Sequence, residues 1–238
     1  MDTTELLNTI RKNKGLGDFL MTFAFDCPNH PNEAKLMDID VMKVNFCRYT
    51  KRTMYYAESF IEHLNKIEID LRTYHNDKGN TFMAMIPDDI FFDFDAFVFS
   101  CKSIVEGNMM ARSKGFHPSV KNAFNEYAES TFHRFVKSYL TPLRDEVVHL
   151  NNFGSAISSM AGIKNDKLHI RAFNYTDDFE LQKVFETILI EMTSIIKNVA
   201  VFIMLHECNL WGFPKKDTTF STGYSNYKIS DYIKIPGC

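Results

Sequence analysis

The strongest pattern in this sequence is an apolar stripe at three- and four-residue spacing across residues 177–208. Residues at that spacing lie on one face of an α-helix, so the pattern predicts a long amphipathic helix with one buried face. A stripe of this length requires other elements to cover it, and the rest of the chain must supply them. The stripe consists of Leu181, Val184, Phe185, Ile188, Leu189, Met192, Ile195, Ile196, Val199 and Ile203.

Three earlier segments show the same helical period. Residues 41–74 carry a stripe that ends in a run of turn residues with a glycine. Residues 88–106 begin after Pro87 with two acidic residues, which the helix dipole favours in a first turn. Residues 119–152 contain Pro142, which either kinks this helix or opens a new one at a first-turn position. Four amphipathic helices predict a mainly all-α fold, a four-to-five-helix bundle.

The remaining segments lack the helical period. Residues 157–175 contain alternating residues around an Asn-Asp turn, which predicts a small β-hairpin inserted in the bundle. Residues 1–40 are punctuated by Gly and Pro, so we expect an irregular segment with a short helix. Residues 209–238 are aromatic and polar, and we expect a C-terminal extension that packs on the bundle. The bundle itself is expected to occupy residues 41–208.

The composition limits the class of protein. A length of 238 residues fits one domain with elaborations, and 22 Phe with 12 Met predict a core rich in aromatic rings. A formal net charge of -3 excludes a globally basic nucleic-acid binder but allows a local basic site. Five scattered Cys favour reduced thiols. With no apolar region behind the basic residues near the start and no run of about 18 apolar residues, we expect a cytoplasmic protein without a signal peptide or membrane span.

No pattern predicts a metal or a cofactor. Cys27 and His30 have a C-x-x-H spacing, but no second Cys/His pair follows at a distance typical of zinc sites. The chain also has no Gly-rich phosphate loop and no H-E-x-x-H motif. We therefore expect neither a bound metal nor a cofactor.

The sequence Arg144-Asp-Glu-Val-Val-His149 is the strongest candidate for chemistry. Arginine is a permanent, planar cation that matches phosphate oxygens, and histidine transfers protons near neutral pH. Along a helix the directions of Arg144 and His149 differ by about 140°, and arginine is long enough to curl back. Asp145 and His149 share a helix face at i,i+4 spacing, so the carboxylate is placed to orient the imidazole.

The spacing alone is weak evidence. With eight His in the chain and a similar number of Arg, about one such pair arises by chance, and Arg112 and His117 form a second. That second pair spans Gly115 and precedes a proline, which indicates a loop. Arg144 instead lies within a helical segment, and if Pro142 opens a helix, Arg144 falls in its first turn, where a cation is electrostatically disfavoured. Such a local conflict is a pointer to function. The alternative is that Arg144 is a surface residue and His149 a partly buried one.

The motif and its setting resemble HEPN-domain proteins. The family is all-α, and its pattern is Arg, a polar residue that is often Asn, three more residues and His. Arg144, Asp145 and His149 match this pattern, with Asp in place of the commoner Asn. The segment PDDIFFDFDAFVFSCKSIVE is similar to the family's second element, and the resemblance covers about residues 40–208.

The resemblance implies metal-independent endoribonuclease activity in a homodimer whose two Arg/His sets line one cleft, often in defence or toxin-like RNA cleavage. His149 would take the proton of a ribose 2′-OH or donate one to the leaving 5′-oxygen, and Arg144 would hold the scissile phosphate. Asp145 would support the pair. The RNA substrate and any protein regulator are left open.

Two other functions fit the same sequence. One is a non-catalytic HEPN-like module for dimerisation or partner binding, and the other is a small-ligand binder lined by Phe and Met. The remaining histidines are expected to be surface or packing residues, and Phe124 and Tyr127 are expected to be core residues on helical spacing. Those histidines are His63, His75, His133, His169 and His206.

Overall fold

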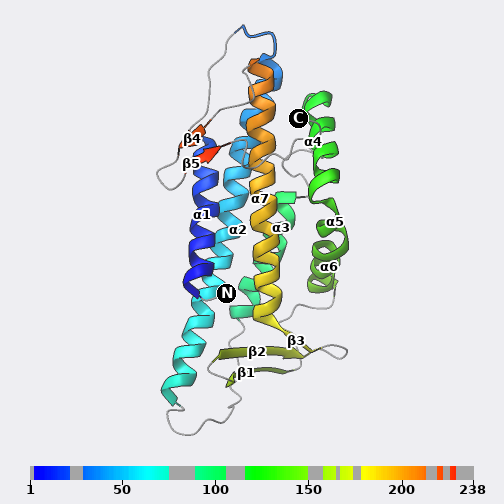
Figure 1. Ribbon diagram of the computed structural model, residues 1–238. Coiled ribbons are helices and arrows are strands. Elements are labelled where there is room, and N and C mark those ends of the chain that lie inside the picture. Colours follow the sequence, from blue (N-terminus) through cyan, green and yellow to red (C-terminus); the bar gives the residue numbers. More distant parts are fainter. Residues whose placement is uncertain are drawn as a thin grey trace.

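The protein is mainly α-helical with a small β-sheet at one end, which confirms the predicted fold class. In the computed structural model, four long helices lie side by side in an elongated bundle (Figure 1). These are α1 (Thr3–Met21), α2 (Glu33–Tyr74), α3 (Asp89–Val105) and α7 (Leu181–Trp211). The structure describes residues 3–21, 29–74, 89–105, 116–149, 158–164, 167–173, 178–212, 219–221 and 226–228.

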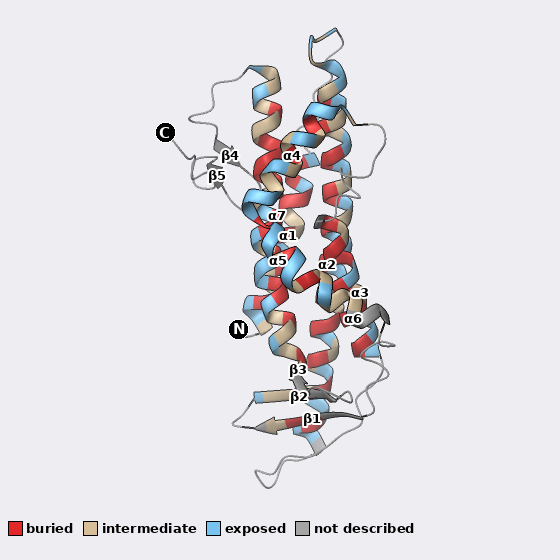
Figure 2. Ribbon diagram, turned by 90° about the vertical axis from the view of Figure 1, so that its right-hand side faces the viewer, coloured by how far each residue is buried: buried red, intermediate tan, exposed pale blue. Residues whose placement is uncertain are grey.

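The central helix is α7, which contacts α1, α2, α3 and α4. Its predicted apolar stripe is buried almost throughout, and Figure 2 shows the buried residues along the inside of the bundle. Gly212, at φ 73°, ends α7 in the left-handed conformation that glycine adopts without strain. Three phenylalanines fill the centre: the Phe185 ring lies 4.5 Å from that of Phe60 and 5.0 Å from that of Phe97.

By length and composition alone, α7 is also a helix long and apolar enough to cross a membrane, a feature that the sequence analysis did not identify. Most of its apolar stretch is buried against the neighbouring helices in the structure. The core helix of a bundle needs the same length and the same apolar face, so this feature is weak evidence for a membrane span.

The N-terminal segment differs from the predicted irregular stretch of residues 1–40. Thr3–Met21 form α1, which packs along α2, and α2 begins at Glu33 instead of near residue 41. The glycines suggested a loop, but Gly17 has a packing role within the helix. A Cβ at Gly17 would lie 3.4 Å from the Cα of Cys47, an ordinary contact distance, so α1 and α2 are close enough here to leave little room for a side chain larger than a methyl group.

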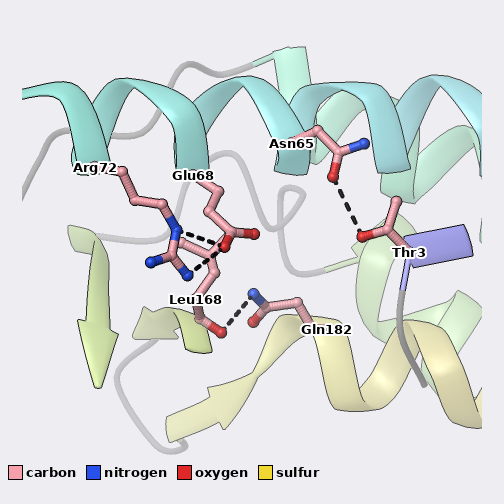
Figure 3. A network of polar contacts seen from close by, with 6 residues as sticks. All are labelled: Thr3, Asn65, Glu68, Arg72, Leu168 and Gln182. Atoms are coloured by element: carbon pink, nitrogen blue, oxygen red, sulfur yellow. Dashed lines mark hydrogen bonds and ion pairs between the residues drawn. The ribbon is translucent and has the colours of Figure 1, made fainter. Parts of the chain in front are cut away.

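The predicted hairpin is present and gains a third strand. Strands β1 (Ser158–Lys164) and β2 (Lys167–Phe173) pair antiparallel, and β3 (Asp178–Glu180) adds to β2. Gln182, at the start of α7, ties the sheet to the bundle: its Nε2 donates to the Leu168 carbonyl at 3.0 Å (Figure 3). Its Oε1 accepts from the Ile170 amide at 2.9 Å, so one side chain replaces two missing backbone partners.

The predicted helix of residues 119–152 is broken into four pieces along one side of the bundle. They are α4 (Pro118–Thr131), α5 (His133–Phe135), a π-helical turn η1 (Val136–Leu140) and α6 (Thr141–His149). Pro142 has no N–H to continue the α-helical ladder, and the wider turn immediately before it ends with the Thr141 amide donating to the Val136 carbonyl. Pro142 therefore sits in the first turn of a new helix, one of the two outcomes that the sequence allowed.

The C-terminal extension is described only in part. Beyond Gly212 the structure describes two short strands, β4 (Thr219–Ser221) and β5 (Asn226–Lys228), which pair antiparallel. The expectation that residues 209–238 pack on the bundle otherwise lies outside the described residues.

Candidate functional site

The helix α6 carries the Arg-x4-His motif at the side of the bundle, against α3 (Figure 1). Arg144 and His149 both belong to this nine-residue helix, so about 7.5 Å of helix axis separates their backbones. The side chains of Arg144 and Asp145 are described, whereas the His149 side chain lies outside the described residues. The predicted contact between Asp145 and His149 therefore also lies outside the part of the chain that the structure describes.

The Arg144 guanidinium is held at the seam between α6 and α3. Its Cζ lies 5.7 Å from the centre of the Phe99 ring, within the range of a cation–π contact. Its Nη1 donates to Asp145 Oδ1 at 2.7 Å. The side chain is still 34% exposed, so an oxyanion in solvent can reach it.

Asp145 therefore has a contact that the sequence did not predict. Its carboxylate accepts from Arg144, the residue beside it in sequence, and offsets part of the guanidinium charge. Both groups are at least one-third exposed, so solvent weakens the ion pair. The contact nevertheless orients the guanidinium next to Phe99 in the arrangement seen here.

The face of α3 beside Arg144 exposes two large aromatic rings. Phe92 is 55% exposed and Phe99 39%, and they are the exposed phenylalanines among the residues whose burial is described. They are seven positions apart and so lie on one face, two turns apart. Exposed apolar rings next to a partly desolvated cation are typical of a contact surface.

Asp95, one turn before Phe99, is the most unusual ionisable group near the site. Its side chain is only 7% exposed, and its Oδ1 has no hydrogen-bond partner among the described residues. Burial raises the pKa of this carboxyl to about 7. The sequence contained a signal for it, because Asp95 lies between Phe91 and Val98 at helical spacing, but the prediction did not use it.

A second polar cluster joins α2 to α3 through Asp93. Ser59 donates to Asp93 Oδ2 at 2.5 Å, and the Nδ1 of His63 lies 2.9 Å from the same oxygen. The His63 approach is an ion-pair contact and not an aligned hydrogen bond. Since the Ser59 hydroxyl points at the carboxylate and not at the imidazole, the cluster does not activate a nucleophilic serine.

Of the second Arg/His pair, Arg112 and His117, the structure describes only His117. Arg112 lies outside the described residues, whereas His117 caps α4, where its Nδ1 accepts from the Ser119 amide at 3.3 Å. The His117 amide also donates to Asp38 at 2.6 Å. These contacts give His117 a structural role.

The other sequence candidates have packing or surface contacts. His30 packs against Trp211 with the ring centres 4.7 Å apart, while Cys27 lies outside the described residues. Phe124 is buried and Tyr127 packs on Phe202, as expected of core residues. Burial lowers the pKa of His206, which stacks on the same ring. Within the described ranges, no group of three His, Cys, Asp or Glu is arranged to hold a metal.

The site thus consists of Arg144 and Asp145 on α6, the exposed rings of Phe92 and Phe99 on α3, and the buried carboxyl of Asp95 between them. Comparison of the chain with protein-family models, with curated proteins and with solved structures gives no match.

Proposed function

We propose that this chain is a metal-independent endoribonuclease of HEPN type, in which Arg144 binds the scissile phosphate and His149 transfers the proton. The observation that supports this most is the placement of both residues on the short helix α6, with the Arg144 guanidinium oriented by its neighbours yet accessible. Arginine at a seam between helices is partly desolvated, which strengthens its attraction for a phosphate.

The chemistry follows from the two residue types. The ribose 2′-oxygen attacks the adjacent phosphorus, a new P–O2′ bond forms, and the P–O5′ bond breaks. His149 in its neutral form accepts the 2′-OH proton, and in its protonated form it donates a proton to the departing 5′-oxygen. Arg144 stabilises the charge that develops on the phosphate oxygens. The products are a 2′,3′-cyclic phosphate and a 5′-hydroxyl, and DNA is not a substrate because it lacks the 2′-OH.

A homodimer supplies the acid and the base at the same time. Two copies of His149 facing one cleft allow one imidazole to accept a proton while the other donates. The exposed Phe99 lies beside Arg144, and the exposed Phe92 lies two turns away on the same face of α3, so a second copy that covers this face buries apolar surface and brings the two sites together.

The dimer face is tested by light scattering coupled to size-exclusion chromatography. Phe92→Ser is expected to give a monomer, because it removes an exposed ring from the proposed interface. The matched control is Ile190→Ser on α7, an apolar residue of similar exposure (52%) on another helix. A monomeric wild-type protein, or equal effects of the two substitutions, contradicts the assigned face.

The nuclease proposal is tested with single-stranded RNA in the presence of EDTA. Wild-type protein is expected to leave 2′,3′-cyclic phosphate ends, and Arg144→Ala or His149→Ala to abolish cleavage while the helical circular dichroism is kept. His133→Ala and Arg134→Ala are the matched controls, since both residues are exposed in α5 on the same side of the bundle. Cleavage that survives His149→Ala, or that the control substitutions abolish equally, contradicts the assignment.

A non-catalytic interaction module is the second candidate. The Arg144–Asp145 ion pair favours it, because a cation already offset by a carboxylate attracts RNA less strongly than a free one. The exposed rings on α3 suit a protein contact equally well. If micromolar dimer leaves both structured and unstructured RNA intact, this function replaces the enzyme.

A further inference from the structure

Asp95 and Arg144 are both placed close to Phe99. Phe99, the ring beneath the Arg144 guanidinium, follows Asp95 by one turn, about 6 Å along the axis of α3. Helices α3 and α6 pack against each other, so a side chain of α6 that contacts Phe99 is close to the turn of α3 that carries Asp95.

Each of the two residues has a buried polar atom with no partner among the described residues. In Asp95 this atom is Oδ1, an acceptor, and in Arg144 it is Nε, a donor. An unpaired buried donor or acceptor costs free energy, and the two atoms are complementary. Arginine has many rotamers, so Arg144 can span one helical turn by changing its side-chain torsions.

We propose that Arg144 has two alternative carboxylate partners, Asp145 at the surface and Asp95 inside the seam, and that Asp95 positions the guanidinium by withdrawing it from the surface. The arrangement with Asp145 is the one seen in the structure. In the other, Arg144 leaves the Phe99 ring and donates from Nε to Asp95 Oδ1. The functional meaning rests on the proposed nuclease, because a withdrawn Arg144 no longer meets a phosphate.

The protonation state of Asp95 selects between the two arrangements. Burial raises the pKa of Asp95 to about 7, so its carboxyl is neutral in mildly acidic solution and negatively charged in mildly basic solution. Only the charged form attracts the guanidinium strongly. Lower pH therefore favours Arg144 at the surface with Asp145, and higher pH favours Arg144 in the seam with Asp95.

Among the described residues, other titratable side chains lie on α3 itself and on the elements that pack against it. On α3, Asp93 is engaged by Ser59 and His63 of α2, and Lys102 lies about 10 Å from Asp95 along the axis. On η1 the titratable side chains are Lys137 and Tyr139, with burial raising the pKa of Tyr139. From α7, Phe185 packs on Phe97, which points away from Asp95 by about 200°.

The experiment is nuclear magnetic resonance of the full chain labelled with 13C-aspartate and 15N-arginine, titrated from about pH 5.5 to 8.5. The Arg144 Nε signal is expected to change with the same midpoint as the Asp95 carboxyl. Asp95→Asn should abolish that change, whereas Asp93→Asn, on the same helix, should leave it intact. An Arg144 signal that is constant with pH, or a change that persists in Asp95→Asn, overturns the proposal.

The pKa of Asp95 in wild type and in Arg144→Met gives a second measurement, and a purely structural role of Asp95 would leave the two values equal. If ionised Asp95 pairs with Arg144, the pKa of Asp95 in the wild type lies below its pKa in Arg144→Met, by about 1 to 3 units for a close opposite charge. Equal midpoints in the two proteins overturn the proposal.

The consequence for cleavage is measured separately. A pKa difference of about one unit means a roughly tenfold preference for the withdrawn arrangement once Asp95 is charged. Asp95→Asn is then expected to cleave RNA about tenfold faster than wild type at pH 8.5 and equally fast at pH 6. If the wild type has no nuclease activity, the proposed function fails, and the resonance titration still decides whether Asp95 positions Arg144.

Discussion

Replacing Asp95 by asparagine should remove a large pH dependence from the stability of the fold. In the unfolded chain this carboxyl titrates near 3.8, whereas burial raises its pKa to about 7 in the folded protein. Between those values the folded state holds a proton that the unfolded state has released. Stability contributed by the neutral carboxyl is therefore fully present below about pH 4, falls as the pH rises towards 7, and is constant above that.

The size of the effect follows from the shift in pKa. A difference of about three units corresponds to roughly 4 kcal/mol between pH 4 and pH 8. The side chain is 7% exposed, so solvent screening reduces this figure little. Pairing of ionised Asp95 with Arg144 would reduce this loss of stability between pH 4 and pH 8, and Arg144→Met should then restore the full loss.

Urea unfolding at several pH values measures the effect as the difference in free energy of unfolding between wild type and Asp95→Asn. The amide introduced by Asp95→Asn cannot ionise, and its burial costs about 1–3 kcal/mol at every pH. The free energy of unfolding of this variant is therefore lower by a constant amount, and the pH dependence due to Asp95 is lost. Asp93→Asn is the control, because Asp93 has partners in Ser59 and His63. If wild type and Asp95→Asn lose stability in parallel as the pH rises, the reasoning about burial of Asp95 is refuted.

Three further substitutions test the packing of the bundle. Lys43→Met leaves Glu207 buried without its cation and should cost about 3–5 kcal/mol in urea unfolding, with recovery in the double variant that also carries Glu207→Leu. Gly17→Val should lower the thermal midpoint, because its side chain meets the backbone of Cys47, whereas an unchanged midpoint contradicts the close helix contact. Gln182→Ala should speed amide exchange at Ile170 in the hairpin and leave α7 protected.

The sequence predicted the elements whose apolar pattern is continuous. The stripe of α7 and the alternation around the hairpin specify local structure directly, and both are found. Only a short helix was expected where α1 lies, because Gly15 and Gly17 resemble loop signals, and the close packing of Gly17 on Cys47 of α2 has no signal in the sequence of α1 itself. The breaks before α6 were signalled by Pro142, but the π-helical turn depends on how the chain packs around it.

The candidate site was predictable only along one helix. The spacing of Arg144 and His149 places both on α6, and the structure agrees. The Phe99 ring under Arg144 and the partnerless oxygen of Asp95 arise because α3 packs against α6, and such contacts between distant segments have no periodic signature. The ion pair between Arg144 and Asp145 is a rotamer choice that spacing does not determine.

The most direct test of the central claim is RNA cleavage in EDTA by purified wild type, Arg144→Ala and His149→Ala, with His133→Ala as the control. The proposed mechanism predicts cyclic-phosphate products from the wild type and the control, and none from either of the two site variants. Intact RNA with the wild type, or equal cleavage by wild type and His149→Ala, contradicts the assignment of Arg144 and His149 as a ribonuclease site.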